Sequence, residues 1–401
     1  MKFGKILGIL FMFSCLFFCA SFSPTAEAKD AKWIDVHTHL VPTDVPQGIS
    51  GPRDGKTQGQ NRRMDRSETS GYRRQPGMQR KNSAREDLDQ EDTDSEEGYL
   101  KAAASLIRTM ERLGVDRSIV MPPPHASTKK DEFSYKVLLP AVEKYPDHLI
   151  LGGGGVLLNT MIHGIPADRV TEKIKKRFRE NAAEIVDAGA KVFGEMAVLH
   201  VSYSNTHAFE ETSADHPLFL ELADLSARYG VPIDIHMDCV VQDMPTPDFF
   251  AQSSSKNPGT LKANVSGFEK LLRHNRHAKI VWQHVGRDTL GQQSVSLLRR
   301  LLADHSNLYY AIWARPTKMD AVDLPAGPNQ ILDENYEIKD EWLDLFQEYP
   351  DRFVVGTDGF FSAKTRHMSS AVDSTWTFLD KLPQDLRDKI GGENAVRIYD
   401  L

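Results

Sequence analysis

The sequence is poor in cysteine, and its basic residues do not outnumber its acidic ones. Only 3 of the 401 residues are cysteine, which excludes a small scaffold stabilised by disulfides. The chain has 49 Lys and Arg residues against 56 Asp and Glu residues, a formal net charge of -7. Because a nucleic-acid binder needs a clustered basic surface to neutralise phosphates, this balance argues against one. With 40% hydrophobic and 26% charged residues, the composition is that of a large globular protein.

Long hydrophobic runs are confined to the N-terminus. Residues 6–22 are almost entirely apolar, follow a short basic start, and precede a small-residue site that ends at Ala28. This order is typical of a cleaved secretory signal peptide over residues 1–28, so we predict that the protein is exported, either to the periplasm or out of the cell. A retained membrane anchor is the alternative, although the run is at the short edge of what spans a bilayer. Cleavage would leave Cys239 as the one thiol, so no intramolecular disulfide is expected.

A second segment lacks apolar side chains. Residues 45–98 contain few of them and a single aromatic residue, Tyr72; the first part is basic, and residues 86–97 are acidic. Such a segment buries too little apolar surface to offset the entropy of ordering, so we predict a disordered or loosely attached insertion. The alternative is a cationic arm that contacts an anionic polymer or a membrane surface.

The rest of the chain alternates between strand-like and helix-like segments. Short apolar runs rich in β-branched residues occur eight times, at residues 33–37, 117–121, 149–153, 190–195, 231–236, 279–284, 307–312 and 352–357. Amphipathic helical stretches lie between them, at residues 100–113, 170–188, 217–229, 268–274, 294–304, 340–349 and 369–382. Eight such units predict an α/β fold, a (β/α)8 TIM barrel built from residues 29–401 with the polar insertion after strand one. A doubly wound open sheet is the alternative, but it would place a glycine fingerprint where His37-Thr38-His39 stands.

Histidines and carboxylates lie at the ends of five of these predicted strands. They are His37 and His39 on the first strand, Glu195 on the fourth, His236 on the fifth, His284 on the sixth and Asp358 on the eighth. Residues two apart on a strand point to the same side, so His37 and His39 can bind one ion. The C-terminal strand ends of a barrel form the face where active sites lie. Imidazole and carboxylate ligands favour a divalent metal, with zinc as the first choice and manganese or iron as alternatives.

This ordered set resembles the amidohydrolase superfamily of metal-dependent hydrolases. The opening IDVHTHL of residues 34–40 and the closing GGENAVRIY of residues 391–399 resemble the branch that contains aminocarboxymuconate-semialdehyde decarboxylase. The resemblance implies four metal ligands, His37, His39, His236 and Asp358. It also implies that Asp358 takes a proton from metal-bound water, whose pKa the ion lowers. His284 would bind a second metal or act as a general acid and base.

Glu195 bears on the choice between two reactions. Two-metal members of the superfamily place a bridging carboxylate or a carbamylated lysine at the end of strand four, which single-metal decarboxylases are not expected to need. We therefore predict a hydrolase that cleaves a C–N or C–O bond of an amide, lactone or ester with metal-activated water, using one or two zinc ions. A metal-dependent decarboxylase is the alternative. Lys191 is the other candidate bridging group, and an ion pair between Glu195 and Arg315 beside a single ion is the structural alternative.

Candidate substrate-binding residues follow the predicted strands two, four and seven. They are His125, His200 and Arg315, and Arg315 can either hold a substrate carboxylate or form a structural ion pair. Asp238 is a candidate to orient a metal ligand. A small-molecule substrate is expected, with no nucleic-acid partner and no membrane span after signal cleavage, and the sequence is compatible with a homo-oligomer. The third hypothesis is a non-catalytic protein that binds metal or a surface, against which the intact acid and base positions argue.

Overall fold

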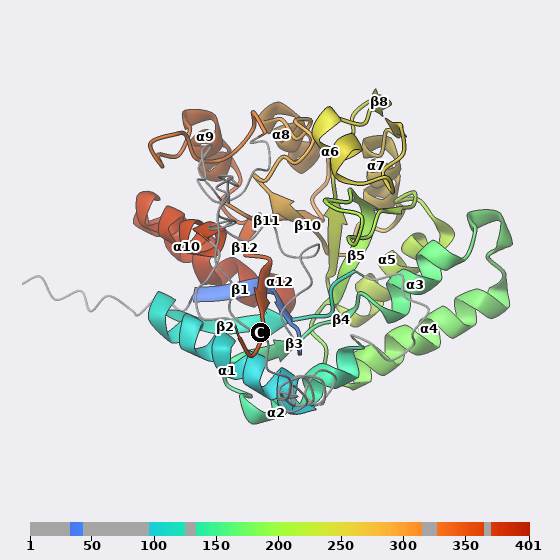
Figure 1. Ribbon diagram of the computed structural model, residues 1–401, viewed down its shortest axis with the longest axis horizontal. Coiled ribbons are helices and arrows are strands. Elements are labelled where there is room, and N and C mark those ends of the chain that lie inside the picture. Colours follow the sequence, from blue (N-terminus) through green and yellow to red (C-terminus); the bar gives the residue numbers. More distant parts are fainter. Residues whose placement is uncertain (1–32, 43–95, 125–133, 315–326, 365–369) are drawn as a thin grey trace, which may run out of the picture. The chain divides into compact units, whose positions relative to one another are not determined.

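Parallel strands occupy the centre of the computed structural model, with helices outside them (Figure 1). The structure describes residues 33–42, 96–124, 134–314, 327–364 and 370–401, all of which belong to the compact unit Lys32–Leu401. The central strands are β1 (Trp33–Leu40), β2 (Val115–Val120), β3 (Leu149–Leu151), β4 (Gly153–Gly154), β5 (Phe193–His200), β7 (Ile233–Met237), β10 (Ile280–Val285), β11 (Leu308–Ile312) and β12 (Phe353–Val355). They run in the order β3-β2-β1-β12-β11-β10-β7-β5-β4, and each neighbouring pair is parallel.

The two ends of this sheet are halves of one strand, so the sheet closes into a barrel. Only Gly152 separates β3, which pairs with β2, from β4, which pairs with β5. A Cβ atom on Gly152 would lie 2.8 Å from Met121 Cβ and 2.8 Å from Val192 Cγ1, so glycine is needed where the two neighbouring strands approach. Counting β3 and β4 together gives eight parallel strands, and the predicted (β/α)8 barrel is confirmed.

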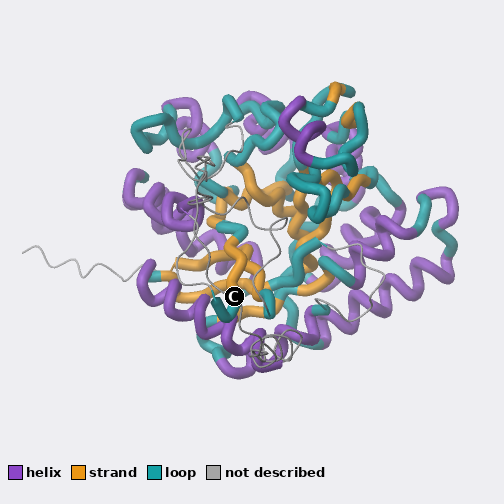
Figure 2. Tube along the Cα trace, in the orientation of Figure 1, coloured by secondary structure: helices purple, strands orange, loops and turns teal. Residues whose placement is uncertain are grey.

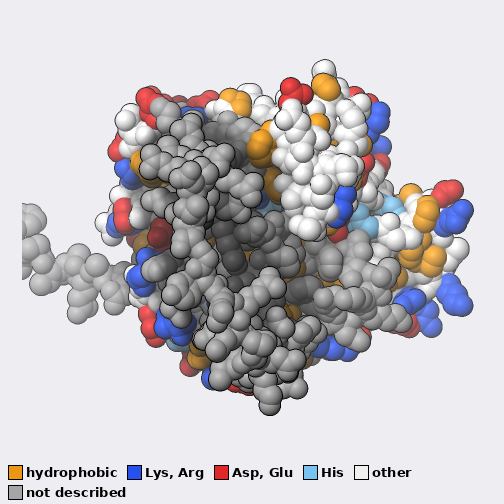
Figure 3. All heavy atoms as spheres, viewed as in Figure 1, with side chains coloured by type: hydrophobic (Ala, Val, Ile, Leu, Met, Phe, Trp, Pro, Cys, Tyr) orange, Lys and Arg blue, Asp and Glu red, His pale blue; other side chains and the backbone are white. Residues whose placement is uncertain are grey.

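Helices surround the strands, as Figure 2 shows in purple around orange. They are α1 (Glu96–Leu113), α2 (Leu139–Lys144), α3 (Leu157–Gly164), α4 (Glu172–Asp187), α5 (Pro217–Tyr229), α6 (Asp248–Ser253), α7 (Val265–His274), α8 (Val295–Asp304), α9 (Asp340–Glu348), α10 (Ser370–Thr377), α11 (Gln384–Asp388) and α12 (Asn394–Tyr399). On the face drawn in Figure 3, the basic and acidic side chains of the described residues are interspersed. None of the described helices has the length and hydropathy needed to cross a membrane.

Short strands extend the barrel at its active-site end. β6 (Glu210–Glu211) pairs antiparallel with the end of β5, and β13 (Gly359–Phe361) pairs parallel with the end of β1. β8 (Met244–Pro245) and β9 (Thr260–Leu261) form a separate hairpin. These additions follow strands β5, β7 and β12 in the chain, so they belong to the loops that shape the site.

Two hydrophobic clusters hold the barrel. The larger one fills the space between strands and helices and includes the fully buried side chains of Trp282, Trp342 and Phe346. The second lies inside the barrel. It combines residues on the strands or directly next to them, Ile34, Val36, Ile119, Met121, Val192, Val281, Ala311 and Val354, with Ala395, Ile398 and Tyr399 of α12. The C-terminal helix therefore closes the interior of the barrel from the end opposite the strand C-termini.

Several element boundaries differ from the predictions, and two of these differences concern the site and the predicted insertion. β5 continues to His200, so Glu195 is the third residue of its strand and not the last. Helix α1 begins at Glu96, inside the segment predicted as an insertion, because Glu96 and Glu97 suit the positive end of the helix dipole. The predicted signal peptide, residues 1–28, and residues 45–95 of the predicted insertion lie outside the described residues.

Candidate metal centre

The barrel strands bring all six predicted metal ligands to one place. β1 supplies His37 and His39, and the other four residues come from β5, from β7, from β10 and from the position just after β12: Glu195, His236, His284 and Asp358. Five of the six side chains are buried, and that of Asp358 is 19% exposed. The six residues chosen from the spacing of the strands therefore lie together, and their role as metal ligands stays a prediction.

One half of the centre is formed around the two histidines of β1. His37 Nε2 lies 3.1 Å from His39 Nε2, and Glu195 Oε2 lies 3.4 Å from each of these nitrogens. Asp358 Oδ1 is 3.4 Å from His39 Nε2 and 3.9 Å from His37 Nε2. Two imidazole nitrogens and two carboxylate oxygens therefore converge on one point.

The other half uses the second oxygen of Glu195. Its Oε1 lies 2.9 Å from His236 Nδ1 and 3.0 Å from His284 Nε2. Glu195 therefore contacts both pairs of histidines. Three overlapping groups can each hold an ion: His37, His39 and Glu195; His37, His284 and Asp358; and Glu195, His236 and His284.

Charge in the centre is concentrated on buried carboxylates. Burial alone would raise the pKa of Glu195, but the charge of His37 and hydrogen bonds from His236 and His284 hold it well below its usual value. Burial likewise opposes charge on His236, yet its contacts with Asp238 and Glu195 raise the pKa of His236 to about 9. The two carboxylates thus favour a proton on His236, and a divalent cation would satisfy the same negative charge. The donor set of imidazole and carboxylate groups fits zinc, manganese or iron.

Contacts outside the donor set fix the rings of β1. His39 Nδ1 lies 2.9 Å from Met121 O, which favours the tautomer that donates to this carbonyl and leaves Nε2 for the metal. Asp35 accepts hydrogen bonds from the backbone N–H of His37, at 3.1 Å, and from the hydroxyl of Thr357, at 2.6 Å. The first and last barrel strands are thereby joined next to the centre.

Arg287 is a site residue that the sequence analysis missed. It follows β10, three residues after His284, and its guanidinium stacks over the rings of Tyr203 and Trp313, each 5.1 Å away. Arg287 Nη2 donates a hydrogen bond of 2.6 Å to Tyr203 Oη, and Nη1 lies 3.7 Å from Asp358 Oδ2. The signal available in the sequence was its position in the loop directly after a ligand-bearing strand.

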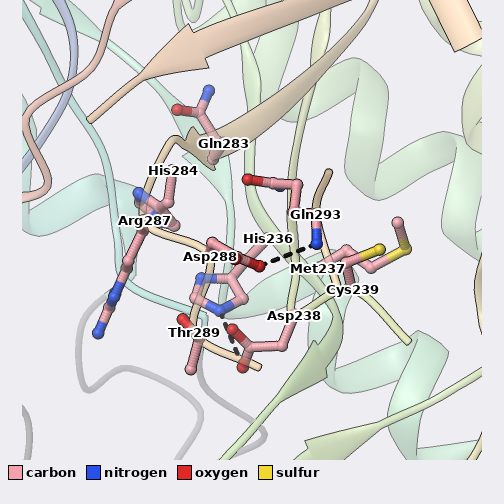
Figure 4. Close-up of a pocket in the computed structure, with 10 residues that line it drawn as sticks. All are labelled: His236, Met237, Asp238, Cys239, Gln283, His284, Arg287, Asp288, Thr289 and Gln293. Carbon is pink, nitrogen blue, oxygen red and sulfur yellow. Dashed lines mark hydrogen bonds and ion pairs between the residues drawn. The ribbon is translucent and has the colours of Figure 1, made fainter. Parts of the chain in front are cut away.

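A pocket opens beside the centre and is drawn in Figure 4. His236, His284 and Arg287 line it, and one of the dashed contacts in the figure joins the ring of His236 to Asp238 at 3.7 Å. Asp238 also accepts a hydrogen bond of 2.9 Å from the backbone N–H of Val201, so its carboxylate is fixed while it faces His236. This placement agrees with the orienting role predicted for Asp238.

The remaining predicted residues have separate locations. His200 lies at the end of β5 with its ring centroid 4.4 Å from that of His236, at the rim of the centre. Lys191 is outside the centre, since its ammonium group donates to the carbonyl of Asp400, and it therefore cannot act as the bridging group. His125 and Arg315 lie outside the described residues.

The similarity of this chain to known proteins with solved structures is low. No curated protein matches this chain. Solved structures with some similarity include an uncharacterised TIM-barrel protein from Bordetella bronchiseptica, with 17% identity over 74% of this chain and 81% of the other and a TM-score of 0.43. They also include a probable 2-pyrone-4,6-dicarboxylic acid hydrolase from Acinetobacter baumannii, with 12% identity, coverage of 92% and 100%, and a TM-score of 0.45. A third is a dihydroxybenzoic acid decarboxylase from a Polaromonas species with bound manganese, with 14% identity, coverage of 74% and 85%, and a TM-score of 0.42.

The family itself is identified from the sequence. The sequence model described as amidohydrolase matches residues 163–401, which is more than half of the chain. The matched part contains Glu195, His236, His284 and Asp358, four of the six residues that meet in the centre. The resemblance predicted from the sequence is confirmed, and this chain is an enzyme of the amidohydrolase family.

Proposed function

We propose that this enzyme is a metal-dependent decarboxylase, a carbon–carbon lyase that releases CO₂ from a small unsaturated or aromatic carboxylic acid. The observation that carries the proposal is Arg287, a largely buried cation at the edge of the metal centre. Its guanidinium lies 3.7 Å from Asp358, which is ion-pair distance but longer than a hydrogen bond. A planar guanidinium held by two aromatic rings suits bidentate binding of a carboxylate.

The residues of the centre suit such a substrate. His37, His39 and Asp358 would hold a divalent ion together with His236 or Glu195. When bound, the ion supplies Lewis acidity that polarises the oxygens of a coordinated substrate. Arg287 would bind and orient the substrate carboxylate, and the walls of the pocket would exclude water from it.

His284 is placed to handle the proton. Its Nε2 contacts Glu195. Its other ring nitrogen, Nδ1, is buried and has no hydrogen-bond partner among the described residues, so we assign the proton transfer to Nδ1. Burial lowers the pKa of His284 to about 4, so the ring is mainly neutral near pH 7 and, once protonated, gives up its proton more readily than an ordinary imidazolium. The C–C bond to the carboxyl group breaks with its electron pair left on the substrate carbon, and His284 delivers a proton to that carbon and regains one from water.

Glu195 supports hydrolysis as the second candidate function. Its two oxygens reach both pairs of histidines, so it can bridge two ions in the manner of a two-metal hydrolase. We place hydrolysis second because Glu195 Oε1 already accepts hydrogen bonds from His236 and His284. These contacts make Glu195 a counter-ion for the histidines around a single metal ion.

A substrate screen separates the two functions. The metal-loaded protein is incubated with a panel of unsaturated and aromatic carboxylic acids and with a panel of amides, lactones and esters. CO₂ release from the first panel supports decarboxylation, whereas product formation from the second panel without CO₂ supports hydrolysis. Turnover of neither panel would favour the non-catalytic metal-binding hypothesis. Elemental analysis of the same protein gives the identity of the metal, for which we propose zinc, and the number of ions per chain.

Arg287→Lys tests the carboxylate contact. Lysine keeps the positive charge but loses the planar pair of donors, so we expect KM for the acid substrate to rise about 10-fold or more, with a smaller change in kcat. Arg352→Lys is the matched control, because Arg352 also stacks on a tyrosine, Tyr309, and donates to backbone carbonyls away from the centre. Equal KM values in the two variants would contradict a role of Arg287 in binding substrate.

We also propose that the enzyme acts outside the cytoplasm. The basic, apolar and small-residue order of residues 1–28 supports this. Mass spectrometry of the N-terminus of the protein recovered from cell fractions tests it: a chain beginning at Lys29 in the periplasm or medium is expected, and an intact N-terminus in the cytoplasm would contradict export.

A further inference from the structure

A buried carboxylate lies next to the metal centre. Asp234, on β7, places Oδ2 3.7 Å from Nδ1 of His37. Both side chains are completely buried, and the distance between these two atoms is longer than a hydrogen bond. Neither atom has a hydrogen-bond partner of ordinary length among the described residues. Since His37 presents Nε2 to His39 and the other ligand atoms, Nδ1 is the nitrogen that a metal ligand turns away from the ion.

The other oxygen of this carboxylate is held by the C-terminal helix. Tyr399, the last residue of α12, donates a hydrogen bond of 2.9 Å from its hydroxyl to Asp234 Oδ1. Buried carboxylates are costly unless they are paired, so this contact and the facing imidazole together account for the burial of Asp234. A continuous line of side chains therefore runs from the C-terminal helix through Asp234 to the metal ligand His37.

Two lysines fix the end of the helix that bears Tyr399. Lys279, just before β10, donates a hydrogen bond of 2.7 Å from Nζ to the carbonyl of Ile398. Lys191, just before β5, donates one of 2.8 Å from Nζ to the carbonyl of Asp400. The side chains of Ile398 and Tyr399 also belong to the hydrophobic cluster inside the barrel. The hydroxyl of Tyr399 is therefore held in a defined position.

The strand beside Asp234 is shaped to admit it. A Cβ atom on Gly194 would lie 2.8 Å from Asp234 Cβ and 3.6 Å from Asp234 Cγ, so glycine at position 194 lets β5 approach the base of the Asp234 side chain closely. The position of Asp234 is thus fixed from three sides, by β5, by α12 and by His37.

We propose that Asp234, held by Tyr399, is a positioning residue that orients His37 and strengthens it as a metal ligand. With Nδ1–H donating to the carboxylate, the ring keeps the tautomer in which Nε2 has its lone pair for the ion, and the carboxylate makes that nitrogen more basic. The C-terminal helix thereby sets the affinity of the centre for metal. This inference rests on the metal site of the proposed function and does not depend on which reaction the site performs.

The test compares metal affinity in three single variants of the full chain. Asp234→Asn removes the charge, Tyr399→Phe removes only the hydroxyl, and Tyr310→Phe is the matched control. Tyr310 is also fully buried, and its hydroxyl donates to Leu298 O at 3.0 Å in the outer core, away from the centre. Dissociation constants for Zn²⁺ and Mn²⁺ are measured by competition with a chelator at fixed pH, and the unfolding temperature is measured without metal.

We expect Asp234→Asn to weaken metal binding by about 10- to 100-fold and Tyr399→Phe to weaken it at the lower end of that range. The two tyrosine variants should lose similar stability in the metal-free state, while Tyr310→Phe keeps the wild-type affinity. Equal affinities in Tyr399→Phe and Tyr310→Phe would overturn the inference, and this comparison remains valid even if Asp234→Asn does not fold. A wild-type protein that binds neither metal would instead overturn the proposed function itself.

Discussion

Two residues of the metal centre have backbone conformations that residues other than glycine rarely adopt. His284 has φ of 59° and Asp358 has φ of 52°, both in the left-handed region. Such conformations persist where surrounding structure determines them, and they occur often at functional sites. In this barrel the neighbouring strands fix both residues, so the centre is held in position by the backbone as well as by side-chain contacts.

Asp358→Asn tests the chemical role of this carboxylate. Asparagine has nearly the same size and also tolerates the left-handed conformation, so the fold should be kept while the charge is lost. Because Asp358 is one of the residues proposed to hold the metal, we expect activity to fall by about 100-fold or more. Asp400→Asn, at a position with φ of 53° and an exposed side chain, is the control that should keep full activity. Full turnover by Asp358→Asn on the substrate found in the screen would rule out the proposed role.

Cys239 lies close to the pocket in sequence and space but is not expected to react. It is 4% exposed, and burial together with the charges of Asp288 and Asp238 raises the pKa of its thiol above the usual range. The thiolate is the reactive form, so iodoacetamide at pH 8 should leave Cys239 unmodified in the folded protein and modify it in denaturant. Mass mapping of the peptide that contains Cys239 measures this, and rapid alkylation of the native protein would show that the thiol is accessible.

At the scale of helices and strands, the sequence was a good guide. All eight predicted strands form, and the predicted helix at residues 217–229 coincides with α5, because the alternation of buried and exposed positions follows directly from apolar spacing. Boundaries were less predictable: β5 runs on to His200 because its end pairs with β6, a contact between segments that periodicity does not reveal. Arg287 and Asp234 could not be found from spacing, since their roles depend on rings and carboxylates that other strands bring beside them.

The end of α5 gives a prediction about stability. Gly230 follows the helix with φ of 73°, and a Cβ atom there would meet nothing within 4 Å, so only the backbone conformation disfavours other residues. Gly230→Ala should therefore destabilise the protein by about 1 kcal/mol. Gly164→Ala, at the end of α3, has equally open space without a positive φ and should stabilise by up to about 1 kcal/mol. Chemical denaturation measures both, and equal effects would contradict the conformational explanation.

At the scale of the whole molecule, the metal centre joins strands from all around the barrel, so its occupancy should affect global stability. A ligand that binds only the folded state, present at 100 times its Kd, raises the free energy of unfolding by about 2.7 kcal/mol. We therefore expect chelation to lower the unfolding temperature by several degrees and added Zn²⁺ or Mn²⁺ to restore it. A variant with His37 and His39 both replaced by glutamine should show no response to metal. An unfolding temperature that is the same with and without metal in the wild type would contradict the site.

The hydrogen bonds between Asp35 and Thr357 join residues that are 322 positions apart. While the chain is being synthesised, the first barrel strand and its two histidines emerge long before Asp358 does. A complete donor set can therefore form only after nearly the whole polypeptide has been made, and a truncated or stalled product would lack it. We expect metal loading to be a late event that marks completion of the fold, so that incomplete chains are unable to retain the ion.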